Sequence, residues 1–172
     1  VDVIMLTGAP PFMLLGPEKE AALTESWTKK FKTPVITDPQ MQVAALRAMK
    51  IKKFIGASYS ALQNKIVLDY MTAAGFRALS MEPIDVPFDQ VAQISVEMLY
   101  AHVKSLYRQH RDADGVYIQG GGWQTVRVIE LLEKDLGIPV VHATICQAWQ
   151  IHKQLDVRET KPGYGRLLTE LP

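Results

Sequence analysis

Three consecutive glycines, Gly120 to Gly122, end an apolar run and are followed at once by a tryptophan. They bring free backbone N–H groups to the predicted start of a helix, where the helix dipole favours an anion. The two phosphate-loop patterns, G-x-G-x-x-G and G-x-x-x-x-G-K-[ST], are both missing. The pattern leaves two interpretations open: a carboxylate or phosphate site, and a tight strand-to-helix turn that glycine permits.

The cysteine and the histidines give weaker evidence of a functional site than the glycine run does. Cys146 lies in the first turn of a predicted helix, where the dipole lowers a thiol pKa, but a lone cysteine in an apolar helix is more often an inert core residue. His142 ends a predicted strand and could supply a proton, although capping the next helix is the more ordinary role. Three other histidines have no paired spacing with acidic residues, so we expect neither a metal site nor a cofactor: His102, His110 and His152.

The elements that must position these residues alternate between short β-branched runs and amphipathic stretches of helix length. This alternation is typical of parallel βαβ units and predicts an α/β fold. Strands are expected at about residues 2–7, 34–37, 53–58, 76–81, 114–119 and 139–142. Helices are expected at about residues 17–31, 38–49, 60–74, 87–110, 123–135 and 144–154.

An internal repeat predicts the topology. "DVIMLTG", Asp2 to Gly8, and "DGVYIQG", Asp114 to Gly120, share the order Asp, buried strand, polar residue, glycine. A helix and a proline-led strand follow each copy, "TPVIT" in the first and "IPVVH" in the second. The repeat predicts two pseudo-symmetric, doubly wound parallel-sheet lobes, with Gly8 and Gly120 at a ligand cleft between them.

The predicted lobes divide the chain unequally. We assign residues 1–51 to the first lobe and residues 52–155 to the second. The first lobe has about two strands of its own, which is too few for an independently stable sheet. We therefore expect the first lobe to be incomplete in this chain.

Composition narrows the function classes. The 172-residue chain has a formal net charge of +1, which gives no bulk field to attract nucleic acid or an anionic membrane. No apolar segment is long enough to span a bilayer. The single cysteine excludes an internal disulfide framework and favours a reducing, cytoplasmic location. The expected partner is a small ligand, and the formation of a homo-oligomer remains open.

Several longer motifs point to a family. "ADGVYIQGGGW", "LGIPVVHATICQAW" and "KPGYGRLL", taken with "VDVIMLTGAP" and "FIGASYSALQN", resemble the aspartate/glutamate racemase superfamily. The similarity runs over essentially the whole chain, and the nearest branch resembles arylmalonate decarboxylase and maleate isomerase. It implies that the beginning of a full-length family member is absent from this chain. It also implies that the tail returns to the first lobe, which then comprises residues 1–51 plus 156–172.

The resemblance also implies a catalytic arrangement. Racemases of this kind use two facing cysteines, one per lobe, whereas the decarboxylases keep only the second thiol and the maleate isomerases use one thiol as a nucleophile. The matching positions here are Gly8 and Gly120. Because glycine has no side chain that can donate or accept a proton, we expect no racemisation by two thiols.

The resemblance implies a partly retained anion site. Family members place hydroxyl-bearing residues after the first thiol position, where this chain has Ala9 and Pro10. Tyr59 stands where the decarboxylases have an anion-binding tyrosine, and Asn64 matches a family asparagine. The residues expected to line the ligand site are Ala9, Tyr59, Asn64, Gly120, Gly121 and His142.

These features predict an enzyme that acts on a small carboxylic acid through an enediolate-type intermediate held in an anion site between the lobes. By resemblance, it would be a cofactor-independent decarboxylase or isomerase. The alternative is a non-catalytic carboxylate-binding relative that has lost the cysteine pair. A nucleotide-binding domain is disfavoured because the chain has no phosphate fingerprint.

Overall fold

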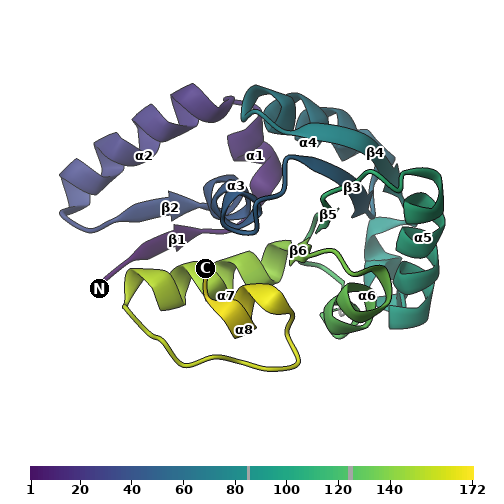
Figure 1. The fold of residues 1–172 in the computed structure, drawn as a ribbon. Helices are drawn as coiled ribbons and strands as arrows, with labels where there is room; N and C mark the ends of the chain where they lie inside the picture. Colours follow the sequence, from purple (N-terminus) through teal and green to yellow (C-terminus); the bar gives the residue numbers. More distant parts are fainter. Residues whose placement is uncertain (85, 124–125) are drawn as a thin grey trace.

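The computed structural model of the chain describes residues 1–84, 86–123 and 126–172. Its described strands form two parallel sheets (Figure 1). The first sheet pairs β1 (Ile4–Leu6) with β2 (Val35–Thr37). The second sheet contains β3 (Lys53–Ser58), β4 (Arg77–Pro83), β5 (Gly115–Ile118) and β6 (Val140–His142). Its strand order is β4-β3-β5-β6, so β3 and β5 are the central strands.

Helices connect and cover the strands. They are α1 (Ala9–Met13), α2 (Pro17–Phe31), α3 (Asp38–Ala48), α4 (Ala61–Ala73), α5 (Val96–Gln109), α6 (Val128–Leu136), α7 (Ala143–Gln154) and α8 (Arg166–Glu170). Figure 1 shows α2 running along the first sheet, where it contacts β2. On the second sheet α4 packs on β4, while α5 and α6 pack on each other. Among the described residues, no helix has the length and apolar character needed to cross a bilayer.

Local sequence signals account for several boundaries. Pro17 opens α2, and Thr37 begins α3 through a capping box with Gln40. Gly137 ends α6 with a φ of 74°, a left-handed conformation that favours glycine. For α2 and β3 the predicted bounds are the ones that the structure has.

The single helix predicted over residues 87–110 is wrong. Phe88–Gln93 form a 3-10 helix, η1, and Ile94 is extended. α5 then begins after Ser95, whose hydroxyl accepts a hydrogen bond from the Met98 amide at 3.2 Å. This side-chain cap starts a new helix inside a stretch whose apolar periodicity suggested one continuous helix.

The glycine run does not open a helix, so that prediction is also wrong. α6 begins at Val128 rather than at residue 123, and Gln124 and Thr125 lie outside the described residues. The Gly120 carbonyl accepts a hydrogen bond from the Trp123 indole N–H at 2.8 Å. Gly120 itself has a φ of 107°. The glycine run therefore forms a turn in which the Trp123 side chain bonds back to the Gly120 carbonyl.

Buried polar contacts tie the first sheet and its helices to the second. The Tyr117 hydroxyl of β5 donates a hydrogen bond to the Gln42 side chain of α3. The Tyr70 hydroxyl of α4 donates one to the Glu20 carboxylate of α2. Because a buried polar group without a partner is costly, these bridges hold the two halves in one arrangement.

The C-terminal tail packs on helices and a strand of the second sheet. α8 contacts α7 and β6. The Arg166 amide, at the start of α8, donates a hydrogen bond to the Glu133 carboxylate of α6 at 2.8 Å. The assignment of residues 156–172 to the first lobe remains a prediction that rests on the family resemblance.

Candidate functional site

The candidate site lies at the carboxyl ends of the strands. Gly8 comes after β1, Asp38 after β2 and Tyr59 after β3. Gly120 comes after β5, and His142 is the last residue of β6. The strands within each sheet are parallel, so these residues lie at the edges where α/β folds bind ligands.

α7 reaches the strand ends of both sheets. The Gln147 side chain donates a hydrogen bond to Asp38 Oδ1, beyond β2, at 2.9 Å. Thr144 Oγ1 lies 3.5 Å from the position that a Cβ at Gly121 would take, beyond β5. The first turns of α7 therefore lie between the two groups of candidate residues.

The glycines at the two family thiol positions have different surroundings. Both are left-handed, with φ of 96° at Gly8 and 107° at Gly120. A Cβ at Gly8 would meet no atom within 4 Å. A Cβ at Gly120 would lie 2.8 Å from Cζ and 3.0 Å from Cδ1 of Tyr59. The Tyr59 ring therefore fills the place where a side chain of residue 120 would begin.

Tyr59 is held by other aromatic side chains. Its ring meets Trp123 edge-on, with ring centroids 5.2 Å apart, and meets Phe88 at 6.4 Å. Burial raises the pKa of the Tyr59 hydroxyl, and the amide of Gly122 beside it only partly offsets this. The hydroxyl is therefore protonated at neutral pH and can donate a hydrogen bond to an anion.

His142 caps α7 in the structure. Its Nδ1 accepts a hydrogen bond from the Thr144 amide at 3.1 Å, which is the capping role weighed from the sequence. Its side chain is fully buried, and this burial lowers the His142 pKa to about 4. The ring is then neutral at pH 7, with its proton on Nε2, an atom that has no hydrogen-bond partner among the described residues.

Asn64 lies on α4, and its side chain forms hydrogen bonds with two strands of the second sheet. Its Oδ1 accepts a hydrogen bond from the Ser58 hydroxyl at 2.6 Å, and its Nδ2 donates one to the Met81 carbonyl at 3.0 Å. Ser58 ends β3 immediately before Tyr59, while Met81 belongs to β4. These bonds fix the end of β3, and through it the position of Tyr59.

Ala9 and Cys146 are both buried. Ala9 begins α1 and joins the apolar core, so it offers no polar side chain to a ligand. Cys146 lies in α7 with its side chain fully buried. Burial, assisted by the nearby Asp38 charge, raises the pKa of the Cys146 thiol. This agrees with the interpretation of Cys146 as an inert core residue.

Asp38 is a candidate site residue that sequence reasoning missed. Only 7% of it is exposed, and its Oδ2 accepts a hydrogen bond from the Gly8 amide at 3.2 Å. Burial raises the pKa of its carboxyl, although the hydrogen bonds from Gln147 and Gly8 act in the opposite direction. The available signal was an acidic residue directly after a buried proline-led strand, "PVITD". At the first turn of a helix, such a residue is ordinarily explained by the helix dipole.

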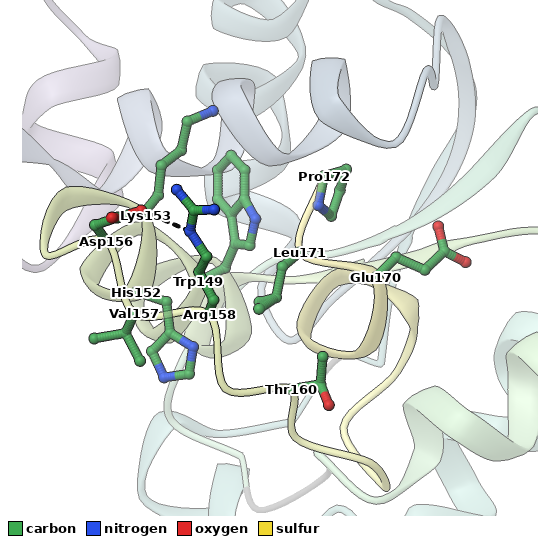
Figure 2. A pocket seen from close by; sticks show the side chains of 10 residues that line it. All are labelled: Trp149, His152, Lys153, Asp156, Val157, Arg158, Thr160, Glu170, Leu171 and Pro172. Carbon is green, nitrogen blue, oxygen red and sulfur yellow. Dashed lines mark hydrogen bonds and ion pairs between the residues drawn. The ribbon is translucent and has the colours of Figure 1, made fainter.

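A separate cavity of about 500 Å³ lies at the far end of α7, against the C-terminal tail (Figure 2). Trp149 of α7 lies beside Leu171 of the tail, and the Lys153 ammonium lies 4.8 Å from the centroid of the Trp149 ring. Its lining mixes basic and acidic side chains, and Arg158 is paired with Asp156 at 3.0 Å. This cavity does not include the strand-end residues.

Known proteins resemble this chain over most of its length. A family model described as arylmalonate decarboxylase matches residues 1–168. The chain belongs to the arylmalonate decarboxylase family. It is 23% identical over 175 residues to the arylmalonate decarboxylase of Bordetella bronchiseptica, covering 98% of this chain and 71% of the relative. It is 29% identical over 142 residues to a maleate isomerase of Pseudomonas putida, covering 79% of this chain and 55% of the relative.

Solved structures give the same family fold. The structure of unliganded arylmalonate decarboxylase matches with a TM-score of 0.89 and 22% identity, covering 98% of this chain and 74% of that one. A Nocardia farcinica maleate cis-trans isomerase mutant with a covalently bound succinylcysteine intermediate matches with a TM-score of 0.88 and 23% identity, covering 98% and 71%. The predicted family resemblance and the two-lobe parallel α/β fold are thereby confirmed.

Proposed function

We propose that this arylmalonate decarboxylase family member acts on a small carboxylic acid through an enediolate-type intermediate, as a cofactor-independent decarboxylase or isomerase. The observation that carries the proposal is the placement of Tyr59 and the glycine run together at the strand ends. Both kinds of activity occur among the named relatives, which include decarboxylases and isomerases.

The chemistry would rest on charge stabilisation. Loss of carbon dioxide from a malonate places negative charge on the oxygens of the remaining carboxylate. Addition of water to the double bond of maleate would do the same, and loss of that water after rotation about the new single bond would give fumarate. The Tyr59 hydroxyl and the backbone amides of Gly120 and Gly121 are neutral donors that do not have to ionise to stabilise that charge. Because the thiol positions are Gly8 and Gly120, the proton that completes the reaction has to come from another acid or from water.

A second candidate is a non-catalytic carboxylate-binding relative. One observation favours it: the Tyr59 ring occupies the space beside Gly120 where a reactive side chain would project. Such a protein would retain the hydrogen-bond donors of the anion site without a positioned proton donor. It would bind carboxylates and leave them unchanged.

The experiment combines turnover with binding. Incubation with phenylmalonate and with maleate, followed by proton NMR, detects phenylacetate and fumarate as products. The wild-type protein should form one of them faster than the buffer does, and Tyr59→Phe should slow that reaction. Saturable carboxylate binding without either product would favour the second candidate. Absence of both binding and turnover would contradict the proposal.

A further inference from the structure

The Gly8 amide, the first backbone donor beyond β1, already has a carboxylate partner. Asp38 Oδ2 accepts its hydrogen bond at 3.2 Å, and Asp38 Oδ1 accepts one from Gln147 at 2.9 Å. A backbone amide has a single hydrogen. A ligand carboxylate can therefore use the Gly8 amide only by displacing the Asp38 carboxylate or by lying directly against it.

The groups that face Asp38 do not neutralise its charge. Its hydrogen-bond donors are the backbone amide of Gly8 and the side-chain amide of Gln147. Tyr59, Tyr117 and Cys146 are close enough to be affected by it, and each has a pKa raised first by burial and further by the Asp38 charge. No lysine or arginine is among the described groups that shift the Asp38 pKa.

Two other titratable side chains approach from elements packed near α3. Glu20 of α2 accepts a hydrogen bond from Thr37, the residue before Asp38. Burial raises the Glu20 pKa, which favours its neutral form. His142 ends β6, which contacts α3, and burial keeps its ring neutral at pH 7. Neither residue supplies a positive charge for a second carboxylate.

From this geometry we propose that Asp38 is a specificity-determining residue that admits a ligand carboxylate at Gly8 only together with one proton, which the two carboxyl groups share. The inference rests on the proposed carboxylic-acid function and specifies how that acid is bound. Two ionised carboxylates in direct contact repel each other, and the Asp38 carboxylate is buried, so one of the pair takes up a proton. The shared proton replaces the repulsion with a short, charge-assisted O–H···O hydrogen bond.

The arrangement selects for charge as well as shape. One proton leaves a single negative charge on the pair of carboxyl groups, which is the charge that the site already carries when Asp38 is ionised. A doubly charged phosphate would leave an additional uncompensated charge. The pair therefore favours a ligand that presents one carboxylate to Gly8.

The test is calorimetric titration with phenylacetate between pH about 6 and about 8. This monocarboxylate stays ionised in that range because ordinary carboxyl pKa values lie near 4. Each pH is measured in two buffers of different ionisation enthalpy, which gives the number of protons taken up per bound ligand. For the wild-type protein with Asp38 ionised, we expect an uptake of about one proton and an affinity that falls about tenfold per pH unit.

Two variants isolate the residue responsible. Asp38→Asn should take up no proton and should hold an affinity that changes by less than about twofold over the same range, because no carboxyl pair forms. Glu133→Gln is the matched control, since Glu133 is another buried carboxyl with a pKa raised by burial. It bonds to the Val140 and Arg166 amides instead of to the strand-end residues, so the wild-type proton uptake should persist in this control.

The outcomes separate this inference from the proposed function. Phenylacetate binding to the wild type without proton uptake overturns the inference and leaves carboxylate binding intact. Retention of the uptake in Asp38→Asn also overturns it. Binding to Asp38→Asn but not to the wild type also overturns the inference, since the shared-proton pair then does not form in the natural protein. Failure of both proteins to bind contradicts the inference and the proposed function together. The uptake measured on the unaltered protein remains decisive if Asp38→Asn does not fold.

Discussion

Gly120→Ala should destabilise the protein much more than the same change at either of two nearby glycines. The new Cβ would lie 2.8 Å from Cζ of Tyr59, and the backbone at residue 120 has a φ of 107°. A left-handed conformation costs a residue with a side chain about 1–3 kcal/mol. Forcing an extra carbon into a packed place costs about 1–3 kcal/mol more. The free energy of unfolding should therefore fall by about 2–6 kcal/mol.

Two control variants separate the contributions. Gly8→Ala has the same backbone strain, with a φ of 96°, but its Cβ would meet nothing within 4 Å. Gly8→Ala should lower the free energy of unfolding only by the backbone strain, about 1–3 kcal/mol. Gly121→Ala has neither problem, because its Cβ would make ordinary contact with Thr144 Oγ1 at 3.5 Å. Its effect should stay within about 0.5 kcal/mol.

Urea unfolding monitored by tryptophan fluorescence measures all three variants. The midpoint should fall in the order Gly121→Ala, Gly8→Ala, Gly120→Ala, with little change in the slope that reports the exposed surface. In a Tyr59→Ala background, the extra cost of Gly120→Ala over Gly8→Ala should disappear, because the clashing ring is gone. Equal midpoints for Gly8→Ala and Gly120→Ala in the wild-type background would refute the claim that the ring fills this place.

Three further predictions concern single side chains. Tyr59→Phe should weaken phenylacetate binding by about 1.5–3 kcal/mol, measured by titration, because it removes one hydrogen bond to a charged group; unchanged affinity would leave Tyr59 a packing role only. Burial lowers the His142 pKa from 6.5 to about 4, so the folded state resists protonation that the unfolded chain accepts. The stability that the neutral ring contributes is fully present above pH 6.5, and about 3 kcal/mol of it should be lost as the pH falls through 4. Acidification should therefore bring the urea midpoints of the wild type and His142→Gln together. The buried Cys146 thiol should react with a disulfide reagent only as fast as the protein unfolds, and rapid labelling of the native protein would contradict its burial.

Much of the fold was predictable because local signals agreed with the tertiary structure. β3 is buried on both faces from Phe54 to Ser58, which is the pattern of a central parallel strand. Pro17, at the first position of α2, indicated the start of that helix in the sequence. The error over residues 87–110 arose where two local rules conflict. Apolar spacing continues through Ser95, yet Ser95 caps a new helix and Ile94 is extended.

The candidate site was less predictable because its contacts join distant parts of the chain. Asp38 and Gly8 are separated by 30 residues and meet only because β1 and β2 pair side by side. Tyr59 and Gly120 meet only because β3 and β5 are neighbours in the second sheet. Sequence reasoning found both glycines through the internal repeat and Tyr59 through the family resemblance. It had no means of showing that a ring fills the space beside one glycine and that a carboxylate bonds to the amide of the other.

The buried bridges between the two halves determine how a ligand can reach the strand ends. Rotating the halves apart about a hinge would break the Tyr117–Gln42 and Tyr70–Glu20 hydrogen bonds and leave buried groups unpaired. Rotation of the half-buried Tyr59 ring breaks no hydrogen bond between the halves and uncovers Gly120. Association should therefore be gated by the motion of one aromatic side chain rather than by domain opening, and its rate should depend on how tightly Trp123 and Phe88 hold that ring.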